Sequence, residues 1–300
     1  TRPDPYLPLG VLRFNHDTSE PFAQYRRGVD FETGEAWCRW REGEAAFDRR
    51  VFVSRTADLV VFHQSSDYPG RQTGAFWFSP RDDFGQMARQ FATAGENATL
   101  GGSGFEEGGL PVRSKAGADG DCFWISAETD TGVPYGAVGL VVAHGGSVTP
   151  ATNAAAVKGA DVLTVLVALY HNESADTALP RLRERVAELP GDYESLLATH
   201  REAHRPLFRR CVLHLDHADA PADVPNEDLL ARAYDGDVPP ALIQRMHDLG
   251  RFLLICSSRP GGLPANLQGV WNGDYAPAWA ADYHNDENVQ MCYWLAGPAQ

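Results

Sequence analysis

Short apolar runs dominate the first 170 residues of the chain. They are β-branched or aromatic, and Gly, Pro, Asp and Asn bound them, which is the pattern of strands. They lie at residues 36–40, 50–53, 59–62, 74–78, 122–125, 137–143 and 162–170. This spacing favours an antiparallel β-sandwich. Residues 93–120 are rich in Gly and poor in apolar side chains, so we expect a surface loop there.

The period of the pattern changes to a helical one after residue 172. Residues 174–189 predict one helix, which ends before Pro190. Residues 193–208 predict a second, interrupted near Pro206. His200 and His204 are four residues apart on it, which is a metal-ligand spacing, but no third ligand accompanies them. We therefore expect packed or surface histidines.

The rest of the chain predicts further helices. Residues 211–216 alternate in polarity and predict an isolated strand that returns to the sheet. Residues 221–240 read as a connector with a short helix at 228–234, and residues 242–255 as a helix with more than one apolar face. A last helix is expected from Asn288. The apolar helix should be buried in an all-α domain.

These elements predict three parts. A β-sandwich domain occupies residues 1–172, a helical linker with the return strand occupies residues 173–220, and residues 221–300 begin an all-α domain. We expect the third part to be cut short, because too few residues follow its first long helix to complete a helical barrel.

Composition excludes several classes of protein. The 300 residues are 43% apolar, with no run of eighteen that would predict a membrane span. The formal net charge is −14 and no basic stripe is available, so nucleic acid and anionic membranes are not expected partners. Signal-peptide features are absent, but the chain starts at Thr1 and not at Met, so their absence says little about where the protein is located. The compartment stays open, with the cytoplasm slightly favoured over secretion.

The cysteines do not form a recognisable site. Five are present, widely separated and never in a CxxC pair, which predicts buried free thiols. They are Cys38, Cys122, Cys211, Cys256 and Cys292. No metal site or cofactor is expected.

Residues 258–294 concentrate the chemistry of the chain. They combine carboxylates, amides, a histidine and three tryptophans in a run with little periodicity. Amides and carboxylates can orient sugar hydroxyls, and an indole can lie under the C–H face of a pyranose. The segment therefore predicts a carbohydrate site. The alternative is a structural loop whose Trp residues belong to the core.

Two blocks in this segment closely resemble glycoside hydrolase family 95, the inverting α-L-fucosidases and their α-L-galactosidase relatives. Residues 257–272 match the family's Ser-Ser-Arg-Pro-Gly-x-Leu-Pro-x-Asn-Leu-Gln-Gly-x-Trp-Asn signature. Residues 284–294 match most of its His-x-Asn-x-Asn-x-Gln-Met-Asn-Tyr-Trp block. Weaker matches at residues 6–10, 24–27, 157–161 and 204–208 extend the resemblance over nearly the whole chain.

The resemblance implies a β-sandwich, a helical linker and the first helices of a six-fold (α/α) barrel, with both ends of the family's length missing. It also implies that two asparagines of the second block serve the attacking water, polarised by a downstream aspartate, while a downstream glutamate is the general acid. The second asparagine is Asn288 and the first falls on Asp286, which departs from the family. Asp286 could accept a proton itself, bind a sugar hydroxyl or mark a branch with another substrate. Glu287 is not nominated as the acid, because neighbours on a helix point about 100° apart.

Six further residues are expected to contact the sugar. His284 would hydrogen-bond a hydroxyl, with bracing of the loop as its alternative. The amides of three residues could orient hydroxyls, and two tryptophans could form a stacking wall, although packing roles stay open for each. They are Asn266, Gln268, Asn272, Trp271 and Trp279.

The sequence thus predicts a glycoside hydrolase that releases terminal α-L-fucosyl or α-L-galactosyl residues, and we expect the isolated chain to lack its general acid and to be inactive. The alternatives are a degenerate glycan-binding protein of the same fold and an inverting glycoside phosphorylase. A phosphorylase is disfavoured because Arg259 is the sole Arg or Lys between residues 252 and 300. The preferred sugar, the linkage and the oligomeric state stay open.

Overall fold

A computed structural model describes residues 8–18, 20–80, 112–129, 131–216, 224–273 and 278–298. The chain divides into two compact units. One comprises residues 1–30, 35–200 and 272–280, and the other comprises residues 31–34, 201–271 and 281–300. We call them the sandwich unit and the helical unit, and describe each by itself.

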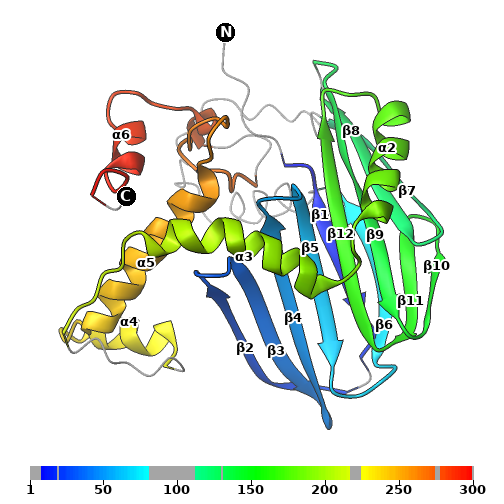
Figure 1. Ribbon diagram of the computed structural model, residues 1–300, viewed down its shortest axis with the longest axis horizontal. Helices are drawn as coiled ribbons and strands as arrows, with labels where there is room; N and C mark the ends of the chain where they lie inside the picture. The colour runs from blue at the N-terminus through cyan, green and yellow to red at the C-terminus, as the bar shows by residue number, and fades with distance from the viewer. Residues whose placement is uncertain are drawn as a thin grey trace, which may run out of the picture. The chain divides into compact units, whose positions relative to one another are not determined.

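The sandwich unit contains two antiparallel sheets (Figure 1). The larger has the strand order β2 (Phe22–Asp30), β3 (Glu35–Glu42), β4 (Ala45–Ser54), β5 (Leu59–Ser66), β12 (Val162–His171), β9 (Pro134–His144), β8 (Cys122–Thr129) and β7 (Val112–Asp119). The smaller has the order β1 (Val11–His16), β6 (Gln72–Ser79), β11 (Ala154–Ala160) and β10 (Ser147–Pro150).

Apolar side chains from both sheets form one core. It includes Phe76 of β6, Phe123 of β8 and Leu163 of β12, all with no exposed surface. The opposite face of the large sheet packs against α2 (Ala175–Glu188), whose Ala178, Leu182 and Val186 are fully buried (Figure 1). The central strands β9 and β12 are thus buried on both faces, which explains their continuous apolar sequences.

The histidines of α3 (Tyr193–Arg209) are packed, as expected. His200 is buried and its Nδ1 accepts a hydrogen bond from the backbone N–H of Arg55 at 3.2 Å. His204 is buried with Nε2 2.9 Å from the carbonyl oxygen of Phe31. Within the part of the chain that the structure describes, no group of three or more His, Cys, Asp or Glu could hold a metal ion.

The helical unit contains α4 (Asn226–Tyr234), α5 (Pro240–Ser257) and α6 (Asn288–Tyr293), and the short η1 (Ala278–Ala281) follows the first signature block. Leu229, Ala241 and Leu242 form a small buried cluster between α4 and α5. Arg251 of α5 is also buried. Its two terminal nitrogens donate to the carbonyl oxygens of Leu207, Phe208 and Cys211, so backbone at and just beyond the end of α3 pairs with the buried guanidinium. No described helix is long and apolar enough to cross a membrane.

The fold class is confirmed: an antiparallel β-sandwich precedes helices. Five strands were not predicted, namely β1, β2, β7, β10 and β11. The prediction of a loop at residues 93–120 is wrong for β7, which pairs along its whole length with β8. The consecutive polar residues Arg113, Ser114 and Lys115 are all exposed at the edge of the sheet, so this strand lacks the apolar signal of a central strand. The earlier part of the predicted loop lies outside the described residues.

Two further predictions need correction. Residues 211–216 form no strand, because their backbone bonds side chains of α5 instead: Leu215 N–H donates to Gln244 Oε1 and Cys211 O accepts from Arg251. The helix α3 continues through Pro206 to Arg209, since a proline in the last turn removes only one helical hydrogen bond.

The covering of α5 by later helices of an all-α domain stays a prediction. In this chain one face of α5 packs on the other described segments, and Ile243, Met246, Leu249 and Leu253 are exposed. The five cysteines are free, as expected, but only Cys122 is buried, and Cys292 is exposed.

Candidate functional site

The first signature block begins where α5 ends. Ser258 leaves the helix with an extended backbone, φ −129° and ψ 128°, as expected two residues before a proline. Gly262 N–H then donates to Arg259 O, which closes a turn in which Gly261 has a φ of +80°. This turn lines a hollow of about 350 Å³ together with Leu263, Pro264 and Tyr293. None of the eight residues predicted from the sequence lines it.

Asn266 organises the next turn. It is 3% exposed, and its Oδ1 accepts the N–H of Gln268 at 2.9 Å while its carbonyl accepts the N–H of Gly269 at 3.0 Å. The side-chain oxygen of Asn266 is therefore committed to the backbone in this structure. Gly269 has a φ of +64°, and a Cβ there would meet the Trp271 ring at 2.7 Å. Trp271 thus packs one side on Gly269 and remains 52% exposed.

Backbone contacts join the second block to the first. Leu267 N–H donates to Asp282 O at 3.3 Å, which brings the chain before α6 alongside the Asn266 turn. Tyr293, on the last turn of α6, makes a second connection. Its hydroxyl lies 2.6 Å from Ser258 Oγ and accepts the N–H of Ala265 at 2.8 Å. Sequence reasoning missed Tyr293, because nothing in its spacing signals a contact across 28 residues.

The turn before α6 carries the predicted catalytic residues. His284 is half-buried with a φ of +29°, an unusual backbone conformation for a residue with a side chain. Its carbonyl accepts Val289 N–H at 3.3 Å, and Gln290 Nε2 donates to Asn285 O at 2.7 Å. These bonds support the loop by its ends.

Asp286 and Asn288 are both exposed on this supported turn. Asp286 lies within the turn and Asn288 is the first residue of α6, with Glu287 between them as its N-cap residue. Both polar side chains are therefore accessible to a ligand from solvent.

The eight predicted residues divide between the units. Asn266, Gln268, Trp271, His284, Asp286 and Asn288 belong to the helical unit. Asn272 and Trp279 belong to the sandwich unit, where Trp279 is 69% exposed with a φ of +50°. The described part of the helical unit therefore brings six of the eight into one compact body.

Two family models match the chain. The glycosyl hydrolase family 65, N-terminal domain matches residues 1–176, and the glycosyl hydrolase family 95 catalytic domain matches residues 192–300. The second range contains all eight predicted residues.

Curated and solved proteins also resemble the chain. It is 28% identical to Alpha-L-fucosidase 2 of Arabidopsis thaliana over 98% of this chain and 36% of that protein. It is 40% identical to Probable alpha-fucosidase A of Aspergillus niger over 102 residues, 34% of this chain and 13% of that protein. A solved structure named "Putative kojibiose phosphorylase from human microbiome" matches with a TM-score of 0.52 and 11% identity, over 88% of this chain and 34% of that one. At that identity the likeness concerns the fold. The chain spans 36% of the length of the Arabidopsis relative.

Proposed function

Because the chain belongs to the glycoside hydrolase family 95-like proteins, with a family 65-type N-terminal domain before a family 95 catalytic segment, we propose that the whole protein hydrolyses terminal α-L-fucosyl residues with inversion. The names of its curated relatives support fucose as the sugar. We keep the division into a sandwich domain at 1–172, a linker at 173–220 and a catalytic domain from 221 as part of this proposal.

The supported turn before α6 is the observation that carries the proposal. Inversion needs a general acid at the leaving oxygen and a separate group that activates water on the opposite face of the sugar. The two side chains on this turn suit the second role. Asp286 offers a carboxylate that can take a proton from water, and Asn288 offers an amide that can orient it. The carbonyl oxygens of His284 and Asn285 accept hydrogen bonds that anchor the turn. The backbone that carries Asp286 and Asn288 is therefore in place before the reaction, which lowers the entropic cost of positioning the water.

The other residues of the two blocks would hold the sugar. We propose that His284 and Gln268 hydrogen-bond hydroxyls and that the exposed face of Trp271 stacks on the ring. The sequence also nominates Asn272 and Trp279 as sugar contacts, and for these two residues of the sandwich unit the role stays a prediction. Asn266 is proposed to act on the sugar site through the turn that it organises.

The experiment is an assay of the whole protein with an aryl α-L-fucoside, in which proton NMR follows the anomer that forms first. We expect β-L-fucose first, independent of phosphate, and slower release from the matching α-L-galactoside. Absence of release would reject the enzyme and favour a glycan-binding protein. Formation of a sugar phosphate only when phosphate is added would identify a phosphorylase instead.

A further inference from the structure

A second hollow, of about 390 Å³, opens on the sandwich unit. Residues of β2, β3, β4 and β5 line it, together with Asp67, which follows β5. All of these belong to the sandwich unit, whereas the catalytic turn proposed above belongs to the helical unit. The hollow has the volume of a small-ligand pocket, which is typically about 300–1,000 Å³.

A β-bulge shapes one side of this hollow. Ala23 pairs with Arg41 and Arg26 pairs with Arg39, so Gln24 and Tyr25 together oppose Trp40. Gln24 adopts a φ of +52°, which a residue with a side chain rarely does, and lines the hollow. Bulges of this kind redirect a side chain that regular pairing would place elsewhere. Here the redirected group is an amide, which can both donate and accept a hydrogen bond.

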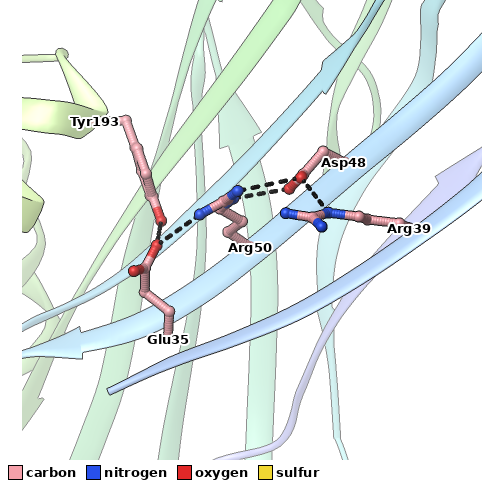
Figure 2. Close-up of polar contacts among 5 residues, drawn as sticks. All are labelled: Glu35, Arg39, Asp48, Arg50 and Tyr193. Carbon is pink, nitrogen blue, oxygen red and sulfur yellow. Dashed lines mark hydrogen bonds and ion pairs between the residues drawn. The ribbon is translucent and has the colours of Figure 1, made fainter. Parts of the chain in front are cut away.

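A chain of ion pairs fixes a guanidinium at the hollow (Figure 2). Arg39 Nε donates to Asp48 Oδ2 at 2.8 Å. Asp48 is itself held by Arg50, through Nε at 2.8 Å and a terminal nitrogen at 3.2 Å. Arg39 pairs with Asp48 through Nε, so its two terminal nitrogens take no part in this pair (Figure 2).

The far end of this chain is anchored in the protein. Arg50 bonds Glu35 at 3.3 Å, and the buried Tyr193 of α3 donates to the same carboxylate at 2.5 Å (Figure 2). The guanidinium of Arg39 also lies 5.1 Å over the Trp37 ring. Asp48 and the Trp37 ring together restrict the Arg39 guanidinium, so it loses little further conformational freedom when it binds a ligand.

The lining balances charge. Arg39 and Arg41 contribute two cations, and Asp48 and Asp67 contribute two carboxylates. Ser65 and Ser66 add hydroxyls. A balanced set of donors and acceptors suits the hydroxyls of a neutral sugar, whereas an anion would meet two carboxylates in a chain of net charge −14.

The apolar side chains at the hollow point away from its polar groups. Arg39 pairs with Asp48 and Trp40 pairs with Phe47 across β3 and β4, and successive side chains of a strand lie on opposite faces of the sheet. The rings of Trp40 and Phe47 stack 5.1 Å apart at 8° and are 8% and 2% exposed, so they belong to the buried face. Binding at the hollow therefore depends on the polar groups.

We infer that this hollow binds a neutral saccharide unit, at a site on the β-sandwich that is separate from the proposed catalytic turn. The saccharide hydroxyls accept from Arg39 and Gln24 and donate to Asp48. Such a site gives the sandwich unit its own hold on a glycan, and it does not depend on the catalytic proposal.

Isothermal titration of the 300-residue chain tests the inference. The probe is 2′-fucosyllactose, a neutral trisaccharide, and glucuronate is titrated separately as an anionic sugar. We expect the trisaccharide to bind, and Arg39→Met to weaken its binding at least tenfold. Gln24→Gly should also weaken it, because this change removes the amide while glycine accepts the positive φ without strain.

Arg181→Met is the matched control. Arg181 is about as exposed as Arg39 and pairs with Glu173 at 2.5 Å, but it lies on α2 and outside the hollow. Its replacement should leave the affinity unchanged. Arg39 and Gln24 belong to the sandwich unit, so a loss of affinity in both Arg39→Met and Gln24→Gly, with Arg181→Met unchanged, assigns the binding to the hollow and not to the proposed catalytic turn.

Three results would overturn the inference. The first is no binding at millimolar trisaccharide. The second is the same affinity for the trisaccharide in all three proteins, namely the parent chain and the variants Arg39→Met and Gln24→Gly. The third is tighter binding of glucuronate than of the trisaccharide. If Arg39→Met fails to fold by circular dichroism, the comparison of Gln24→Gly with Arg181→Met decides the question.

Discussion

The hydroxyl of Tyr293 accepts a hydrogen bond from the backbone N–H of Ala265 at 2.8 Å. Ala265 is 4% exposed, so its N–H would lose a partner in the protein interior without this contact. The same hydroxyl lies 2.6 Å from Ser258 Oγ. One side chain of α6 thereby holds both ends of the turn that leads into the Asn266 turn.

Replacing Tyr293 by Phe should loosen this connection. The change leaves a buried N–H unpaired, which costs about 1–3 kcal/mol of the free energy of unfolding. Urea unfolding measures the loss, and hydrogen exchange at the Ala265 amide should quicken. Tyr234→Phe is the control, since Tyr234 is 90% exposed on α4 and should change stability little. If Tyr293→Phe and Tyr234→Phe have the same free energy of unfolding, the hydroxyl of Tyr293 does not stabilise this turn.

Tyr193→Phe should destabilise the sandwich unit by about 1–3 kcal/mol, because it removes a donor from the buried carboxylate of Glu35. Burial and the hydrogen bond to Glu35 raise the pKa of Tyr193 above its usual range. A raised pKa stabilises the fold below the ordinary tyrosine pKa of about 10, and this contribution is lost as the pH rises further.

The variant should therefore show a smaller loss of stability than the parent between about pH 9 and 11. Thermal melts across this range provide the measurement. The exposed Tyr68, which bonds Glu44 at 3.1 Å, supplies the control Tyr68→Phe. A parent and a Tyr193→Phe variant with the same alkaline profile would contradict the assignment.

His16 should make the sandwich sensitive to acid. Burial lowers the pKa of His16, while Glu42 at 3.3 Å opposes this shift and Arg49 adds to it. A lowered pKa means that the fold prefers neutral His16. Its contribution is complete above about pH 6.5 and is lost as the pH falls through the lowered value. His16→Gln should flatten the fall in melting temperature between pH 7 and 5, whereas exposed His171→Gln should not. Parallel curves for all three proteins would speak against this role.

Two glycines should respond in opposite ways to alanine. A Cβ at Gly136 would lie 2.3 Å from Ile125 O and 2.5 Å from the Tyr170 ring, so Gly136→Ala should destabilise by more than about 1 kcal/mol. Gly250 lies inside α5 and a Cβ there meets nothing within 4 Å. Gly250→Ala should stabilise by about 1 kcal/mol, because alanine favours helix. Chemical denaturation of both variants compares the signs, and like signs would contradict the packing described.

The sequence predicted the central strands and helices because their signal is dense. β9 and β12 are buried on both faces and read as continuous apolar runs. The edge strand β7 escaped prediction, because Arg113 and Lys115 face solvent and pairing alone holds them extended. Residues 211–216 were wrongly predicted as a strand because their polarity alternates. Their backbone groups bond the side chains of Gln244 and Arg251 and not another strand.

The residue types were enough to predict which residues belong to the candidate site, but not the contacts that hold these residues in place. Asp286, Asn288 and Trp271 stand out by chemistry, and the structure places them in one unit with accessible side chains. The contacts that hold them depend on backbone groups far apart in sequence, such as Ala265 with Tyr293. No local pattern encodes such a pair. The burial of Asn266 likewise follows from its turn and not from its type.

The central claim is that the turn before α6 serves the attacking water, and the steady-state kinetics of Asn288→Ala in the whole protein with an aryl α-L-fucoside test it most directly. Positioning of water matters in the transition state, so kcat should fall far more than KM rises. Asp286→Asn, measured beside it, should lose about 10²–10⁴-fold in kcat if Asp286 is the base, and should keep activity if it stands in for an amide. Unchanged kcat and KM in both variants would contradict the account and leave the block a structural turn.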